Sequence, residues 1–229
     1  MSVIVEGRTL TFPVRIADAT AVAGCWVVRA ADVRPLVRDK GFDVAAAAGR
    51  TLAVVALLRY RVNDLGAYDE LGLAVPVRHR GRLGAHVLQL PVTAPFTMAA
   101  GRRLWGLPKW LAEASLDIGP RGASSRWDVD GRTALDVDLR TSPARLPGSV
   151  PTRLTTLAHR DGTVLRSRVR GRARGLRIGL GTTARLVAHA PHPLVDDLRA
   201  LRLTRRPLLT VGIEHLSFDM DPASDETAT

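Results

Sequence analysis

The chain lacks several features that would define its class at once. It has a single cysteine, Cys25, so no internal disulfide can form. It shows no apolar run long enough to cross a bilayer and no charged-then-apolar leader, so we expect a cytoplasmic protein with no membrane partner. Aromatic residues make up only 4% of the 229 residues, which argues against a surface that stacks nucleic-acid bases.

Lysine is also scarce. Lys40 and Lys109 are the only lysines, and the remainder of the 33 basic residues are arginines. Arginine stays protonated in a protein, whereas a desolvated lysine can lose its proton and attack a carbonyl carbon. Lys109 stands between Pro108 and Trp110 in a mostly apolar segment, so it is the candidate nucleophile. The alternative is a lysine stem lying across a tryptophan with its ammonium group in water.

The formal net charge is +11, and most of the arginines that cause it are scattered. The exception is the segment 166–174, where every second residue is arginine. On a strand this spacing places all of these side chains on one face. We interpret that face as solvated or as part of a subunit interface. Nucleic-acid binding is the less favoured interpretation, because it depends on how the charge is distributed as well as on its total.

Hydrophobic periodicity and turn residues predict about ten strands and two or three short helices. The expected strands lie within 3–16, 25–30, 51–60, 71–77, 85–92, 111–118, 125–129, 132–139, 152–159, 161–170, 175–180 and 208–218, and the expected helices within 31–38, 96–102 and 193–203. Loops are expected at 18–24 and 141–150. Without alternating strands and helices, the pattern favours a closed antiparallel barrel or a sandwich. We expect a single domain over 1–218 and a polar, disordered tail over 219–229.

Motifs in three parts of the chain point to a family. Leu65-Gly66-Ala67-Tyr68-Asp69-Glu70 precedes a predicted strand, and Gly101-Arg102 precedes Trp105-Gly106-Leu107-Pro108-Lys109. A third motif, His189-x-x-x-Pro193-Leu194-x-Asp196-Asp197-Leu198, follows near the C-terminus. In this order and spacing the motifs resemble those of the acetoacetate decarboxylase superfamily. The resemblance implies a mainly β fold with a few short helices, arranged as a closed, double-layered β-cone.

The resemblance also implies a reaction. Lys109 matches the Schiff-base lysine of the family and Glu70 matches its cavity glutamate; the alternative for Glu70 is a plain loop carboxylate. Tyr68 is a candidate substrate contact through its hydroxyl, and the alternative is a packing role. A lysine amine condenses with a ketone to an iminium, which accepts the electron pair released when the neighbouring carbon loses carbon dioxide or a proton. We therefore expect a Schiff-base lyase that acts on small keto acids, needs no cofactor and forms a homo-oligomer.

This amine must be neutral to react, whereas a lysine in water has a pKa of about 10.4. The enzyme that gives the family its name has a second lysine directly after the nucleophile, and here that position is Trp110. We therefore expect Trp105, Leu107 and Trp110 to lower the pKa of Lys109 as apolar walls.

Two further departures concern carboxylates. Counting back from Glu70 without gaps, the second glutamate of the family falls at Val55. The family's arginine for a substrate carboxylate has two candidates here, Arg8 and Arg15. A cavity with fewer charges favours aldol addition or dehydration over decarboxylation of acetoacetate.

Other interpretations stay open. The barrel could bind an apolar or acidic metabolite without catalysis, although a binder has no need of an amine that can be deprotonated. We expect no metal site, because His189 and His192 lack a convincing third ligand. No glycine-rich phosphate loop or serine nucleophile elbow occurs.

Overall fold

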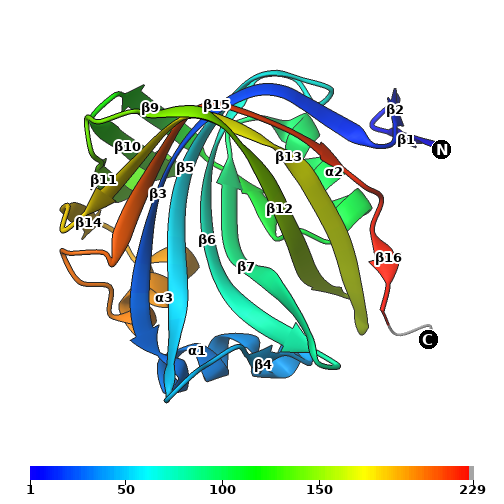
Figure 1. Ribbon diagram of the computed structural model, residues 1–229. Coiled ribbons are helices and arrows are strands. Elements are labelled where there is room, and N and C mark those ends of the chain that lie inside the picture. The colour runs from blue at the N-terminus through cyan, green and yellow to red at the C-terminus, as the bar shows by residue number, and fades with distance from the viewer. Residues whose placement is uncertain (227–229) are drawn as a thin grey trace.

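The computed structural model describes residues 1–226, and its main feature is a closed, cone-like barrel (Figure 1). Seven strands form the ring, in the order β6-β5-β3-β15-β13-β12-β7, and β7 pairs again with β6. Their bounds are β3 Val14–Arg29, β5 Arg50–Asn63, β6 Tyr68–His79, β7 Arg82–Val92, β12 Leu146–Arg160, β13 Thr163–Leu180 and β15 Leu209–Met220. The predicted closed β-cone with a few short helices is confirmed.

The barrel is mixed, so the expectation of a purely antiparallel sheet is wrong. Strand β12 runs parallel to β7, with Thr156 opposite Ala85. The short strand β8 (Lys109–Leu111) also runs parallel to β7. A parallel neighbour requires a crossover connection, and helix α2 (Pro95–Trp105) supplies it between β7 and β8. The short strands β4 (Asp43–Val44) and β16 (Ser224–Asp225) extend the same sheet.

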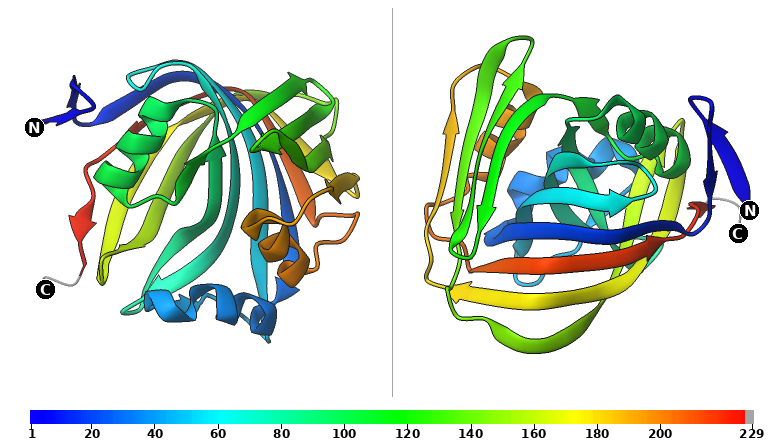
Figure 2. Two further views of the ribbon diagram at one scale, coloured as in Figure 1. Left: turned by 180° about the vertical axis from the view of Figure 1, so that it is seen from behind. Right: turned by 90° about the horizontal axis from the view of Figure 1, so that it is seen from above.

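A second, four-stranded sheet forms the other layer, in the order β14-β11-β10-β9 (Figure 2). Its strands are β9 Glu113–Gly119, β10 Gly122–Val129, β11 Arg132–Arg140 and β14 Ala184–Ala188. Helix α3 (Pro193–Leu201) lies beside this sheet, whereas helix α1 (Ala30–Val37) and a 3-10 turn (Arg38–Lys40) lie across the end of the barrel at which β3 ends. Apolar side chains from both sheets and both helices form one continuous core that includes Trp26, Leu57, Trp127, Leu139 and Leu194.

A second apolar cluster surrounds helix α2. It joins the barrel strands to α2 and to the N-terminal hairpin of β1 (Ser2–Val5) and β2 (Arg8–Thr11). Pro95 occupies the first turn of α2, where its missing N–H costs no hydrogen bond, and Gly106 ends the helix with a left-handed φ of 64°. The chain therefore turns sharply after Trp105 and enters β8 at Lys109.

Strand β3 differs from the sequence prediction. Residues 18–24 were expected as a loop, yet β3 continues through them and is hydrogen-bonded to β5 on one side and β15 on the other. β-Bulges around Asp18 accommodate the irregular spacing of the apolar residues in β3. Pairing along both edges outweighs the weak strand propensity of an alanine- and glycine-rich segment. The expected loop at 141–150 is likewise shortened, because β12 begins at Leu146.

The C-terminal segment was predicted to be disordered from Asp219, and this is wrong as far as Glu226. Strand β15 continues to Met220, and β16 pairs with β13. Glu226 is buried and contacts arginines of two strands, with Oε1 3.0 Å from Arg166 Nη1 and Oε2 2.8 Å from Arg82 Nη1. Partners far away in the sequence thus fix a segment whose own composition is polar. The last part of the predicted tail, 227–229, lies outside the described residues.

We predict that Glu226→Gln lowers the free energy of unfolding at pH 7 by about 1–2 kcal/mol, because two charge-assisted contacts are lost while Arg82 is largely exposed. Burial opposes the charge of Glu226, but Arg166 and Arg82 outweigh it and lower its pKa. The stabilisation is therefore complete above the unfolded pKa of about 4.3 and disappears as the pH falls through the lower folded value.

Urea unfolding of wild type and Glu226→Gln across this pH range tests the prediction. Glu113→Gln, at an exposed position on β9, is the control and should leave the free energy of unfolding unchanged. A difference between wild type and Glu226→Gln that persists at about pH 2 would contradict the assignment to charge.

Candidate active site

A buried ion pair joins β8 to β6. Lys109 Nζ lies 2.8 Å from Glu70 Oε2, and the two residues are only 3% and 6% exposed. Strand β7 lies between them, with Leu90 opposite Lys109 and Val92 opposite Glu70. Residues two apart on a strand face the same side, so the register of these strands brings the amine and the carboxylate together.

Three hydroxyl groups complete the surroundings of the pair. Thr97 Oγ1 accepts a hydrogen bond from Lys109 Nζ at 2.8 Å, and Tyr68 Oη accepts a longer one at 3.4 Å. Tyr60 Oη donates to Glu70 Oε1 at 2.9 Å. The rings of Tyr60 and Tyr68 stack with their centroids 4.3 Å apart, because the two residues are directly opposite in the β5–β6 ladder.

Glu70 Oε2 differs from its companion oxygen. It is buried and lies within ion-pair distance of Lys109, yet no hydrogen bond is directed at it within the described part of the chain. Its contact with the amine is therefore a charge interaction without good hydrogen-bond geometry. This oxygen remains able to accept a proton.

The electrostatics of Lys109 differ from the sequence expectation. Burial alone lowers the pKa of the amine, but the Glu70 carboxylate and the Tyr68 hydroxyl outweigh burial and raise the pKa of Lys109 above its ordinary value. The lysine is thus held as an ammonium in this state. Burial also raises the pKa of both Tyr60 and Tyr68, and for Tyr60 the charge of Glu70 adds to the effect. Both phenols therefore remain protonated, and Tyr60 donates its hydrogen to Glu70.

Helix α2 supplies a wall for the lysine. Thr97 and Gly101 are four residues apart and so lie on one face of the helix. The Lys109 stem passes directly over Gly101: a Cβ atom placed there would lie 2.5 Å from Lys109 Cδ. Sequence reasoning missed Tyr60, Thr97 and this role of Gly101. The available signals were the helical spacing of 97 and 101 and the symmetry of Tyr60 and Tyr68 about their connecting loop.

Trp105 and Leu107 lie in the apolar cluster that contains both tyrosines. The ring of Trp105 meets Phe12 edge-on, and its Nε1 donates to the Asp221 carbonyl at 2.9 Å. Leu107 accepts a backbone hydrogen bond from the Lys109 amide at 2.8 Å. Both residues are buried, and their contacts fix the turn that leads into β8.

Trp110 and Val55 do not face the ion pair. Adjacent residues on a strand point to opposite sides, and the Trp110 ring packs on His192 while its Nε1 donates to Gln89 at 3.1 Å. Val55 pairs with Leu73, an odd number of positions from Glu70, so its side chain lies on the other face of the sheet, within the larger core. Trp110 is therefore not a wall of the lysine pocket, and Val55 is not a cavity position.

Arg8 and Arg15 are both exposed, and neither contacts the ion pair. The guanidinium of Arg8 lies 3.8 Å from the ring centre of Phe96, the neighbour of Thr97 in α2. The amide of Arg15 donates to Asp64 Oδ2 at 2.7 Å, and its side chain has no hydrogen-bonded partner within the described residues. Of the two, Arg8 lies beside the helix that carries Thr97.

No three histidine, cysteine, aspartate or glutamate side chains converge on a possible metal position among residues 1–226. His189 Nε2 instead lies 2.9 Å from Asp136, and His192 accepts the amide hydrogen of Leu194 at the start of α3. No helix in the described chain is long and apolar enough to cross a membrane.

The fold and the site define a closed β-barrel protein with a buried lysine–glutamate pair. The family profile of acetoacetate decarboxylase matches residues 5–148. The acetoacetate decarboxylase of Burkholderia mallei is 30% identical over 176 residues, which covers 69% of this chain and 70% of that protein. The chain belongs to the acetoacetate decarboxylase family.

Solved structures agree in fold. Acetoacetate decarboxylase from Legionella pneumophila superposes with a TM-score of 0.70 at 16% identity, covering 96% of this chain and 92% of that chain. The enduracididine biosynthesis enzyme MppR, in complex with a condensation product of pyruvate and imidazole 4-carboxaldehyde, superposes with a TM-score of 0.63 at 18% identity. That match covers 94% of this chain and 90% of MppR.

We predict that Gly101→Ala destabilises the fold by about 1–3 kcal/mol, although alanine favours a helix. The added methyl group would overlap the lysine stem, and the stem cannot move without breaking the contacts of Nζ with Glu70 and Thr97. Gly72→Ala is a matched control, because its Cβ would meet Leu90 at an ordinary 3.5 Å. Thermal unfolding compares the two variants, and equal melting temperatures would refute the tight contact.

Proposed function

We propose that the protein is a lysine Schiff-base lyase that acts on small keto acids, with Lys109 as the nucleophile and Glu70 as the proton carrier. The observation that supports this most strongly is the buried Lys109–Glu70 pair, with an Nζ–Oε2 distance of 2.8 Å. Family membership supports a decarboxylase-like lyase in general terms. The keto-acid substrate and the imine chemistry are the finer part of the proposal.

The first step follows from the protonation states. Glu70 Oε2 takes a proton from the Lys109 ammonium, and the neutral amine then adds to the ketone carbon. The resulting carbinolamine loses its hydroxyl as water, using the proton held on Glu70, and leaves an iminium. The Glu70 carboxylate returns to its starting state, and the positive charge of the ammonium passes to the iminium. Protons and charge therefore balance.

The iminium nitrogen then accepts an electron pair from the neighbouring carbon. Either carbon dioxide leaves, or Glu70 removes a proton and an enamine forms. We favour the second course, because the described side chains around the amine include a carboxylate and no arginine to bind the substrate carboxylate. An enamine serves aldol addition and dehydration. The fold neighbour MppR, whose structure contains a condensation product of pyruvate, is consistent with such chemistry.

A non-catalytic metabolite binder is the second candidate. It is favoured by one observation: the raised pKa of Lys109 keeps the amine charged, and an ammonium binds an anion without forming an imine.

Whether the protein is a lyase or a binder, we propose that it is a cytoplasmic homo-oligomer. Exposed apolar side chains on β12, at Leu146, Val150 and Leu154, support self-association. On β13, Arg166 and Arg170 pair with Glu226 and Asp221, which weakens the case for nucleic acid.

We predict that borohydride traps pyruvate or acetoacetate on Lys109. The protein is incubated with each keto acid and reduced, and the modified peptide is identified by mass spectrometry. Lys40 is an internal control, because it is the only other lysine and lies far from the site in sequence. Lys109→Arg should abolish the adduct. A protein that binds keto acids but yields no adduct at Lys109 is a binder rather than a lyase.

We further predict that Glu70→Gln shifts the pH dependence of trapping downward by about one pH unit or more. Removing the carboxylate removes the main influence that raises the pKa of Lys109 and leaves burial, which lowers it. The neutral amine is therefore present at lower pH. The midpoint of the pH profile is the readout, since the absolute rate also loses its proton carrier.

Trp110→Gln is the matched control for this experiment. Its ring contacts His192 and Gln89 on the opposite face, so the midpoint should stay where it is in the wild type. An upward shift in Glu70→Gln, or an equal shift in both variants, would contradict the assignment of the raised pKa to Glu70.

A further inference from the structure

Gly72 lies in the interior of β6, two residues after Glu70, so both residues face the same side of the strand. Glycine weakens a strand interior, because it is flexible in the unfolded chain and has no side chain to pack. A glycine in such a place often marks a close approach of another group. The surroundings of Gly72 should therefore show which group uses the space.

That space is open at Gly72. At Gly84 of β7, by comparison, the space is filled, because a Cβ atom would lie 2.7 Å from Leu157 Cγ. At Gly72 the only described atom within 4 Å of such a Cβ, outside the adjoining residues, is Leu90 Cδ1 at an ordinary 3.5 Å. The backbone of Gly72 is a regular strand without a positive φ. Nothing in the described chain thus requires a glycine here, and there is room beside Glu70.

The same side of three neighbouring strands continues this open space. Gly72 is opposite Ala56 of β5, and Ala56 is opposite Ala23 of β3. Six residues on this side, here called the apolar face, are uncharged and half-buried, while their neighbours along each strand are buried. The apolar face consists of Ala23, Cys25, Val54, Ala56, Gly72 and Ala74.

The apolar face leads from the buried ion pair to solvent. Glu70 is 6% exposed at its inner end, whereas Leu52 and Val27, opposite each other at its outer end, are 38% and 46% exposed. Glu70 Oε2 is buried and receives no directed hydrogen bond within the described residues. A ligand that reaches this oxygen and Lys109 can therefore extend along the apolar face.

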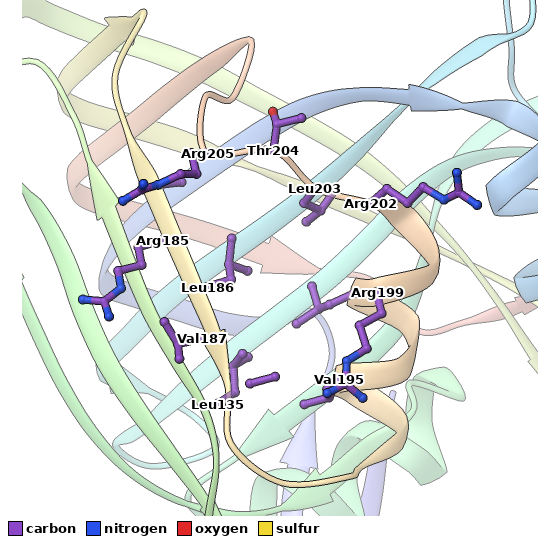
Figure 3. Close-up of a pocket in the computed structure, with 13 residues that line it drawn as sticks. Leu135, Arg185, Leu186, Val187, Val195, Arg199, Arg202, Leu203, Thr204 and Arg205 are labelled. Atoms are coloured by element: carbon purple, nitrogen blue, oxygen red, sulfur yellow. The ribbon is translucent and has the colours of Figure 1, made fainter.

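A hollow between β14 and α3, shown in Figure 3, offers no comparable surface. The aliphatic side chains that line it belong mostly to the buried core, with Leu135 and Val195 only 1% and 0% exposed. An aliphatic ligand in this hollow would remove little apolar area from water.

We propose that the substrate is a keto acid with an unbranched aliphatic chain of several carbons, which lies on the apolar face while the ketone carbon meets Lys109. This inference rests on the proposed lyase function for the position of the ketone. The chain gains free energy in proportion to the apolar area that it removes from water. Gly72 leaves room for the chain where it passes Glu70, and pyruvate would leave the apolar face uncovered.

Isothermal titration calorimetry of the full chain with 2-oxohexanoate and with pyruvate tests the proposal, since it measures binding whether or not an imine forms. Each buried methylene group contributes about fourfold to affinity. We therefore expect 2-oxohexanoate to bind about tenfold or more tightly than pyruvate.

Gly72→Val and Ala56→Val each place a branched side chain on the apolar face, and each should reduce this preference to about twofold or less. The preference is a ratio of two affinities measured on one variant, so a general loss of binding cancels. Gly119→Val, at the end of β9, is the matched control: a Cβ atom there meets nothing within 4 Å, and the preference should persist. Thermal unfolding verifies that each variant folds.

Borohydride trapping of both acids on Lys109 separates this inference from the proposed function. Equal affinities for the two acids, or a preference that persists in both Gly72→Val and Ala56→Val, would overturn the inference even where both acids are trapped. A preference that these variants abolish, without any adduct on Lys109, would refute the lyase and support the apolar face as a chain-binding surface. Failure to bind either acid would overturn both.

Discussion

The arrangement of the site depends on one interaction, the ion pair of Lys109 and Glu70. Burying two charges costs more than their attraction returns unless hydrogen bonds satisfy the remaining polar atoms. Tyr60, Tyr68 and Thr97 provide these bonds, so the pair requires β5, β6 and α2 in fixed positions. The pairing of β8 with β7 brings Lys109 to the side on which Glu70 lies.

Much of this could be predicted from local sequence. The scarcity of lysine singled out Lys109, and the family resemblance of the segment 65–70 singled out Glu70 and Tyr68, which lie at the start of β6. The helices were also found, since Pro95 and Pro193 begin α2 and α3. What these signals share is that a few neighbouring residues determine them: a start residue, a turn, or a rare residue type in an apolar segment.

The features that local sequence did not predict depend on the register between strands that are distant in the chain. Trp110 was expected to wall the lysine, but a residue next to Lys109 on a strand must point to the other face, and only the strand assignment reveals this. The same rule excludes Val55, which was placed by counting along the chain rather than across the β5–β6 ladder. The ordered C-terminal segment depends on Arg82 and Arg166, partners that no local pattern of residues 219–226 identifies.

The raised pKa of Lys109 changes how the proposed reaction is understood. A lysine kept neutral by an apolar pocket needs no proton acceptor, whereas a lysine paired with Glu70 must lose its proton before it can attack. The carboxylate oxygen beside the amine is Glu70 Oε2, which is buried and receives no directed hydrogen bond within the described residues. Once protonated, Glu70 no longer attracts the amine, so burial alone acts and favours the neutral form. In the proposed reaction, a single proton transfer would thus both free the nucleophile and load the acid required by the next step, loss of water from the carbinolamine.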